Sequence, residues 1–155
     1  MELIIYDQSY NPIIQTYQLT EDQLMFTGTP EESILKAEKD LGRYPILALE
    51  NDKLVTFFVL HINEGVKPYT NNEKAILIRA FSTDTREQGK GYASQSLQLL
   101  PPFIKSHFPG VNEIVLAVNV RNIVAQRLYK KCGFADEGKR TMGPSGELIV
   151  MSYYL

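Results

Sequence analysis

The segment Ala80–Ala93 limits what this chain can fold into more than any other part of the sequence. An apolar run enters the segment as a predicted strand, and a predicted helix begins at its end. Gly89 and Gly91 let the backbone approach an anion closely, and the first N–H groups of a helix have no partners within it. Lys90 or Arg86 adds a full positive charge. The segment therefore predicts an anion site suited to a diphosphate, with a glycine turn that binds nothing as the alternative.

We expect one domain over residues 1–155, in which strands and short helices alternate. The predicted strands are rich in β-branched, aromatic and other apolar residues, and they are Leu3–Tyr6, Ile13–Leu19, Tyr44–Glu50, Leu54–Ile62, Ala75–Ser82, Ile114–Asn119 and two strands around Gly143–Gly146. Asn11-Pro12 is interpreted as a turn before the second of them. The almost continuous apolar run Ala75–Ser82 predicts a central strand that is covered on both faces.

Three helices are predicted from capping residues and apolar periodicity. The first follows Thr29, which begins a capping box, and it ends at Gly42. Its apolar face is expected to contain Ile34, Ala37 and Leu41. The second helix follows the anion segment, and Pro101-Pro102 are expected to break or kink it, because proline lacks a backbone donor. The third covers Ile123–Cys132.

Composition excludes several classes of protein. Sixteen Lys and Arg residues against 18 Asp and Glu residues leave a net charge of -2, so no positive field favours nucleic acid or an anionic membrane. The single cysteine, Cys132, has no partner for an internal disulfide, and no Cys/His spacing of a metal site is present. No run of about 18 apolar residues and no basic leader are present, so we expect a cytoplasmic protein.

A second informative segment is Asn122–Phe134. Asn122 is suited to cap the start of a helix, whose apolar stripe contains Ala125, Leu128 and Cys132. Tyr129 lies about two turns after Asn122, close to the same face. Each residue also has a purely structural interpretation, Asn122 as a cap and Tyr129 as a core aromatic with its hydroxyl at the rim.

Together the two segments resemble the GNAT N-acetyltransferase superfamily. The family signature Gln/Arg-x-x-Gly-x-Gly/Ala is matched by Gln88, Gly91 and Ala93. A second family segment is matched by Asn122, Ala125, Leu128, Tyr129, Lys131, Gly133 and Phe134. The resemblance implies an α+β fold, in which helices flank a mostly antiparallel sheet of about seven strands. A V-shaped cleft for acetyl-CoA would open where the strands Ala75–Ser82 and Ile114–Asn119 part.

The resemblance also implies roles for individual residues. Backbone groups of Phe81, Ser82 and Thr83 would pair with the pantetheine arm of acetyl-CoA. The pyrophosphate would be held by N–H groups of Gln88, Gly89, Lys90, Gly91, Tyr92 and Ala93. Asn122 would bind the pantetheine arm, and Tyr129 would point at the thioester sulfur as a catalytic acid.

The chemistry of the reaction supports a tyrosine in that position. A phenol has a pKa of about 10 and a thiol of about 8.5, so a protonated tyrosine can donate to the departing thiolate. An alkyl amine, with a pKa of about 10.4, must lose a proton before it attacks. Glu73 is our predicted catalytic base, acting through a water chain, and His61 and Asp84 are the other candidates. Cys132 has no adjacent histidine, so a structural thiol is favoured over a nucleophile.

The sequence thus predicts an acetyl-CoA-dependent N-acetyltransferase that acts on a primary amine of a small molecule or peptide. Acetyl-CoA and that amine are the expected partners, without a metal, and the chain is a candidate homodimer. A non-catalytic acyl-CoA-binding sensor or partner module of the same fold is the alternative. Tyr129 favours the enzyme, whereas the lack of an obvious base favours the module.

Overall fold

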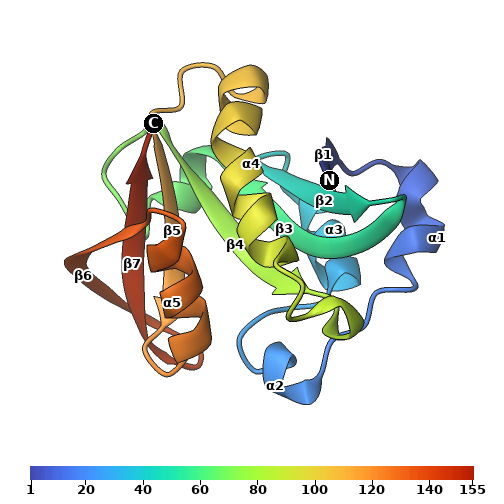
Figure 1. The fold of residues 1–155 in the computed structure, drawn as a ribbon. Helices are drawn as coiled ribbons and strands as arrows, with labels where there is room; N and C mark the ends of the chain where they lie inside the picture. Colours follow the sequence, from blue (N-terminus) through green and yellow to red (C-terminus); the bar gives the residue numbers. More distant parts are fainter.

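A seven-stranded sheet forms the centre of the molecule, which a computed structural model describes over residues 1–155 (Figure 1). The strand order is β1-β2-β3-β4-β5-β7-β6, and only the β4–β5 pair is parallel. The strands are β1 (Glu2–Ile5), β2 (Arg43–Glu50), β3 (Lys53–His61), β4 (Ala75–Thr83), β5 (Glu113–Asn119), β6 (Ala135–Gly143) and β7 (Gly146–Tyr154). The predicted mostly antiparallel sheet of the α+β class is confirmed.

Helices cover both faces of this sheet. They are α1 (Asn11–Ile14), α2 (Glu21–Leu24), α3 (Pro30–Lys39), α4 (Tyr92–His107) and α5 (Ile123–Lys131), with 3-10 turns η1 (Gln8–Tyr10), η2 (Asn63–Val66) and η3 (Thr85–Glu87). Figure 1 shows α4 and α5 on the face toward the viewer and α3 on the other. Leu100 and Ile104 of α4 are fully buried in the larger core, while Ile34 of α3 packs in a second core with β2 and β3. Burial of these apolar faces is the main stabilising contribution.

The sheet splits between its two central strands. β4 and β5 pair only from Ala75 with Glu113 to Ile78 with Leu116. Beyond that point β4 stays with β3 as far as Thr83, and β5 stays with β7. The two strands diverge toward their carboxyl ends (Figure 1). The predicted V-shaped opening is confirmed, and it leaves one edge of β4 without a strand neighbour.

A bulge lies on β4 at the point where the sheet opens. The register pairs Val59 with Arg79 and Phe57 with Ser82, so β4 contains one residue more than β3 over this interval. Ala80 has a φ of 53°, a left-handed conformation that a residue with a side chain rarely adopts. Because the position holds alanine and not glycine, the sequence carried no signal of the bulge.

The predicted strand Ile13–Leu19 is wrong. Residues 8–14 form η1 and the single turn α1, in which Pro12 lies in the first turn, where its missing N–H leaves no hydrogen bond unmade. Ile14 is buried against the second core, so tertiary packing overrides the strand propensity of its neighbours. A Thr20–Gln23 capping box starts α2, a signal that was present in the sequence and was not used.

Two predicted details of the longer helices are also wrong. Helix α4 is not broken at Pro101 and Pro102, because the complete burial of Leu100 and Ile104 holds the helix on the sheet across the lost hydrogen bonds; a kink there stays a prediction. Helix α3 ends at Lys39, before Gly42, and Leu41 is 87% exposed instead of sharing the apolar face. No helix in the structure is long and apolar enough to span a membrane.

Candidate active site

A cavity of about 1110 Å³ occupies the split in the sheet. Its walls come from the carboxyl-terminal half of β4, the facing part of β5, the starts of α4 and α5, the α2–α3 segment and the β6–β7 turn. The volume is slightly above the usual range for small-molecule sites, which is about 300–1,000 Å³. We use two names for parts of the lining, taken from the sequence prediction: the cofactor side contains the lining residues of 81–94 and 119–131, and the acceptor side contains those of 22–43, 69 and 77–79.

The cofactor side presents a run of free backbone donors. No N–H from Gln88 to Ser94 donates a hydrogen bond within the protein, and most of these residues line the cavity. Gly89 and Gly91 have φ values of 79° and 83°, and a Cβ added to either would meet no protein atom within 4 Å. Their backbone is therefore open to close approach, as an anion site at a helix start requires.

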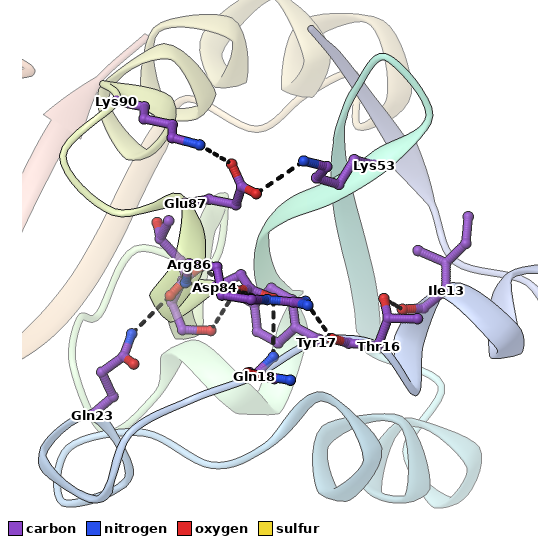
Figure 2. A network of polar contacts seen from close by, with 12 residues as sticks. Ile13, Thr16, Tyr17, Gln18, Gln23, Lys53, Asp84, Arg86, Glu87 and Lys90 are labelled. Carbon is purple, nitrogen blue, oxygen red and sulfur yellow. Dashed lines mark hydrogen bonds and ion pairs between the residues drawn. The ribbon is translucent and has the colours of Figure 1, made fainter.

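Lys90 is the one residue of Gln88–Ser94 that does not line the cavity. Its Nζ donates to Glu87 Oε2 at 2.9 Å, while Lys53 Nζ holds Glu87 Oε1 at 3.1 Å, and the Lys90 side chain does not line the cavity (Figure 2). Lys131 at the end of α5 lines the cavity and is in no ion pair. The positive side chain on the cofactor side is thus Lys131.

The free edge of β4 brings Phe81, Ser82 and Thr83 to the cavity wall; their pairing with a pantetheine arm stays a prediction. Two of these residues use their carbonyl groups within the protein: Tyr17 donates its hydroxyl to Ser82 O, and Gln23 Nε2 donates to Thr83 O, both at 2.7 Å. Phe81 stacks on Phe58, with ring centroids 5.5 Å apart. The N-terminal segment, through Tyr17 and Gln23, and β3, through Phe58, therefore fix this part of β4 in place.

Tyr129 lies in the cavity wall opposite the edge of β4. Its ring meets Phe81 edge to face, with centroids 5.9 Å apart, and it is only 7% exposed. The hydroxyl has no hydrogen-bond partner in the protein. Every fully buried side-chain polar atom of the protein has such a partner, so the Tyr129 hydroxyl is not fully buried and is accessible from the cavity. Burial raises the pKa of Tyr129 above its ordinary value, which keeps the phenol protonated at neutral pH.

Asn122 both caps α5 and lines the cavity. Its Oδ1 accepts the Ala125 N–H at 3.2 Å, the structural role that its position predicts. The cap leaves the amide nitrogen without a partner in the protein. Asn122 is therefore placed on the same side of the cavity as Tyr129 and the Gln88–Ser94 loop.

A buried carboxylate ties the N-terminal segment to the loop after β4 (Figure 2). Asp84 is 1% exposed and accepts Gln18 N at 3.0 Å and Arg86 N at 2.8 Å. The Arg86 guanidinium bonds both carboxylate oxygens and also reaches Thr16 O at 2.6 Å. Burial opposes ionisation of Asp84, but hydrogen bonds from Arg86 and from backbone N–H groups outweigh it and lower its pKa. Asp84 is a structural anchor that does not line the cavity.

The structure does not bring the predicted base, Glu73, to the cavity. Glu73 is exposed and precedes the closed end of β4, where Ala75 pairs with Glu113, whereas the opening begins after Ile78. At about 3.3 Å per residue the strand places it more than about 15 Å from Phe81. Its assignment as a base therefore has no geometric support.

His61, the second candidate base, is buried among charged side chains. His61 Nε2 lies 3.0 Å from Asp40 Oδ2, and Nδ1 lies 3.3 Å from Arg79 Nη1. Burial, together with the positive charges of Arg43 and Arg79, lowers the pKa of His61. The ring is thus a neutral link between an acid and a guanidinium, and it does not line the cavity.

The acceptor side was not identified from the sequence. Its roof is the α2–α3 segment, whose Leu24, Met25 and Phe26 are exposed apolar residues. Arg121 clamps this segment, with its guanidinium 5.8 Å from the Phe26 ring centroid and its Nη2 donating to Ser145 O at 2.8 Å. These contacts join parts of the chain that are far apart in sequence.

Comparison with known proteins places the chain in a family. Residues 13–134 match the acetyltransferase (GNAT) family. The chain belongs to the GNAT acetyltransferase family. It is 40% identical over 156 residues to an uncharacterized N-acetyltransferase, YbbJ, of Bacillus subtilis (strain 168), covering 100% of this chain and 98% of that protein.

Solved structures share the fold. One is AAC(6')-Ib, an aminoglycoside acetyltransferase, in complex with ribostamycin and coenzyme A; its TM-score is 0.80 at 16% identity, with 98% of this chain and 92% of that chain covered. Another is spermidine N-acetyltransferase from Vibrio cholerae in complex with CoA and spermine, with a TM-score of 0.73 at 17% identity, covering 99% and 94%. At these identities the similarity is evidence for the fold only.

Proposed function

We propose that this protein transfers the acetyl group of acetyl-CoA directly to a primary amine. The observation that carries the proposal is one cavity that contains both the free N–H groups of Gln88–Ser94 and the unpartnered Tyr129 hydroxyl. The first suits a pyrophosphate, and the second suits a leaving thiolate. The family relationship, together with neighbours solved with coenzyme A, supports the same assignment.

Acetyl-CoA would supply a thioester whose carbonyl carbon is open to attack. The Gln88–Ser94 loop would hold the pyrophosphate, with Lys131 adding charge, and the free edge of β4 and Asn122 would hold the pantetheine arm. The bulge at the left-handed Ala80 lies directly before this edge. The chain thus fixes the acyl donor mainly through backbone groups, which need no side-chain ordering on binding.

Tyr129 acts as the general acid in this proposal. As the new C–N bond forms and the C–S bond breaks with its electron pair on sulfur, Tyr129 gives its hydroxyl proton to the sulfur. The nitrogen of the former amine loses one proton to water as the amide forms, and water returns a proton to the phenolate. The raised pKa keeps Tyr129 protonated in the resting enzyme. A proton donated as charge develops on sulfur stabilises the transition state more than the bound substrate.

Deprotonation of the amine needs no side-chain base in direct contact. Among the carboxylates that line the cavity, Asp22 and Glu32 are exposed at the mouth, and Glu87 is bound by Lys53 and Lys90. Water in the open cavity is therefore assigned the proton of the incoming ammonium. The rate is expected to rise with pH toward the pKa of the amine itself.

The test is release of free thiol from acetyl-CoA over a panel of amines, with the acetylated product identified by mass spectrometry. The proposal predicts amine-dependent thiol release with one acetyl group transferred per thiol. Binding of acetyl-CoA, seen as a thermal shift, without transfer to any amine would support the non-catalytic binding module instead. A cytoplasmic location and a homodimer stay predictions.

A further inference from the structure

Two guanidinium groups lie at the floor of the acceptor side. Arg43 of β2 pairs across the sheet with His61 of β3, and Arg79 of β4 pairs with Val59 of β3. Val59 and His61 are two residues apart on one strand, so all four side chains point to the same face of the sheet. Arg43, Val59 and Arg79 line the cavity.

The charges of this cluster are not balanced. The carboxylate among Arg43, His61 and Arg79 is Asp40. Its Oδ2 lies 3.2 Å from Arg43 Nε and 3.0 Å from His61 Nε2. Arg79 is in no ion pair, and its one side-chain hydrogen bond goes to the neutral His61 ring. Arg79 is half-buried, and the nearby charge of Arg43 reinforces the effect of burial in lowering its pKa. Partial burial of a guanidinium without a paired anion costs free energy of desolvation, so Arg79 is suited to bind an anion.

Other groups at this end are consistent with an anion. Tyr69 lines the cavity beside Arg79 without a hydrogen bond from its hydroxyl, and Lys36 of α3 adds a free ammonium. The carboxylates on this side, Asp22 and Glu32, are exposed at the mouth on α2 and α3.

The geometry points to an acceptor-side anion subsite on Arg79 and Arg43, which selects primary amines that carry a carboxylate or phosphate group. This inference rests on the proposed function and names its substrate class. Arginine binds both anions through paired N–H groups. The subsite is separate from the pyrophosphate site. Arg79 pairs with Val59 and Thr83 with Thr56, so these two residues of β4 lie about 10 Å apart along β3, and the Gln88–Ser94 loop follows beyond Thr83.

The subsite disfavours amines that carry several positive charges. A polyamine or an aminoglycoside carries several positive charges, which two guanidinium groups at the floor of the cavity repel. An amine whose far end is anionic instead pairs that end with Arg79 and places its nitrogen further along β4, toward Phe81 and Tyr129. We therefore expect spermine and kanamycin to be poor substrates.

The experiment compares matched amines that differ only in the anion, β-alanine with its amide and phosphoethanolamine with ethanolamine. For the wild-type protein we expect kcat/KM to be about tenfold or more higher for the anionic member of at least one pair, as a charge-assisted contact implies. If the preference occurs in one of the two pairs, that pair shows whether the subsite binds a carboxylate or a phosphate. In Arg79→Gln the ratio within that pair should fall toward one, and Arg79→Lys should restore part of it.

Arg140→Gln is the matched control, since Arg140 is an arginine of β6 that pairs with Asp136 and does not line the cavity. It should keep the wild-type ratio. Equal kcat/KM within both pairs, or an Arg79→Gln ratio equal to that of the wild type, overturns the subsite. If no amine is acetylated, the proposed function fails, and calorimetric binding of the same pairs in the presence of CoA decides the subsite: preference for the anionic member supports it, and equal binding overturns it.

Discussion

The two sides of the cavity are built in different ways. The cofactor side contains short continuous segments, Gln88–Ser94 and Asn122–Tyr129, whose backbone geometry would do most of the binding in the proposed function. The acceptor side is assembled from side chains of β2, β3, β4, α2 and α3, tied together by Arg121 and Asp84. Changes to the cofactor side should therefore abolish binding or catalysis, whereas changes to the acceptor side should alter substrate choice or stability.

The largest effect is expected from Gly91→Val. A β-branched residue is strained at a φ of 83°, and its side chain occupies the space that an anion needs. The thermal shift caused by CoA should disappear. Gly110→Val is the control, because Gly110 has a φ of 96° and equally open surroundings but lies outside the cavity. A CoA shift that survives in Gly91→Val would remove the loop from the binding site.

The second largest effect is expected from Tyr129→Phe. Turnover is expected to fall about 100-fold while CoA affinity stays close to that of the wild type, because general acid catalysis acts as charge develops on sulfur. Tyr153→Phe makes the same change on a ring that packs on Phe134 and does not line the cavity, and it should retain activity. A loss of only a few-fold in Tyr129→Phe would argue against the acid.

Asp84→Asn tests the link between the N-terminal segment and the loop after β4. We expect it to destabilise the fold by about 2 kcal/mol, since a charged hydrogen-bond network loses its centre. Because folding lowers the pKa of Asp84 below 3.8, its contribution is full above that value and is lost as pH falls through the folded pKa. The difference in melting temperature between wild type and variant should therefore shrink in acid.

Asp136→Asn is the comparison for that measurement. Asp136 caps a turn and pairs with Arg140 in a similar way, but on an exposed edge strand far from the cavity. It should change stability by less than about 1 kcal/mol. Equal stability of Asp84→Asn and wild type at neutral pH would show that the network does not anchor the N-terminal segment.

The smallest effect is expected from Glu73→Gln. Glu73 is exposed at the closed end of β4, so activity should stay within about twofold of the wild type across the pH range. Initial rates with a fixed amine at several pH values check this. Loss of activity by orders of magnitude would restore Glu73 as the base and would require a different geometry of the opening.

The cofactor side could be predicted from the sequence to a large extent, and the acceptor side could not. Gln88–Ala93 and Asn122–Phe134 are local motifs, so their spacing placed each of them at the start of a helix. The split sheet between them was implied by the resemblance to the GNAT family. The cluster of Asp40, His61 and Arg79 depends on strand register, which no local pattern encodes. Glu73 was misplaced because closeness to β4 in sequence does not say which end of β4 faces the opening.

Hydrogen–deuterium exchange at the Gln88–Ser94 amides, with and without CoA, tests the central claim most directly. These N–H groups have no partners in the protein, so they should exchange fast in the free state and become protected when CoA binds. The amides of β6 should not change. Protection elsewhere, with Gln88–Ser94 exchanging as fast in the complex as in the free protein, would contradict the placement of the pyrophosphate on this loop.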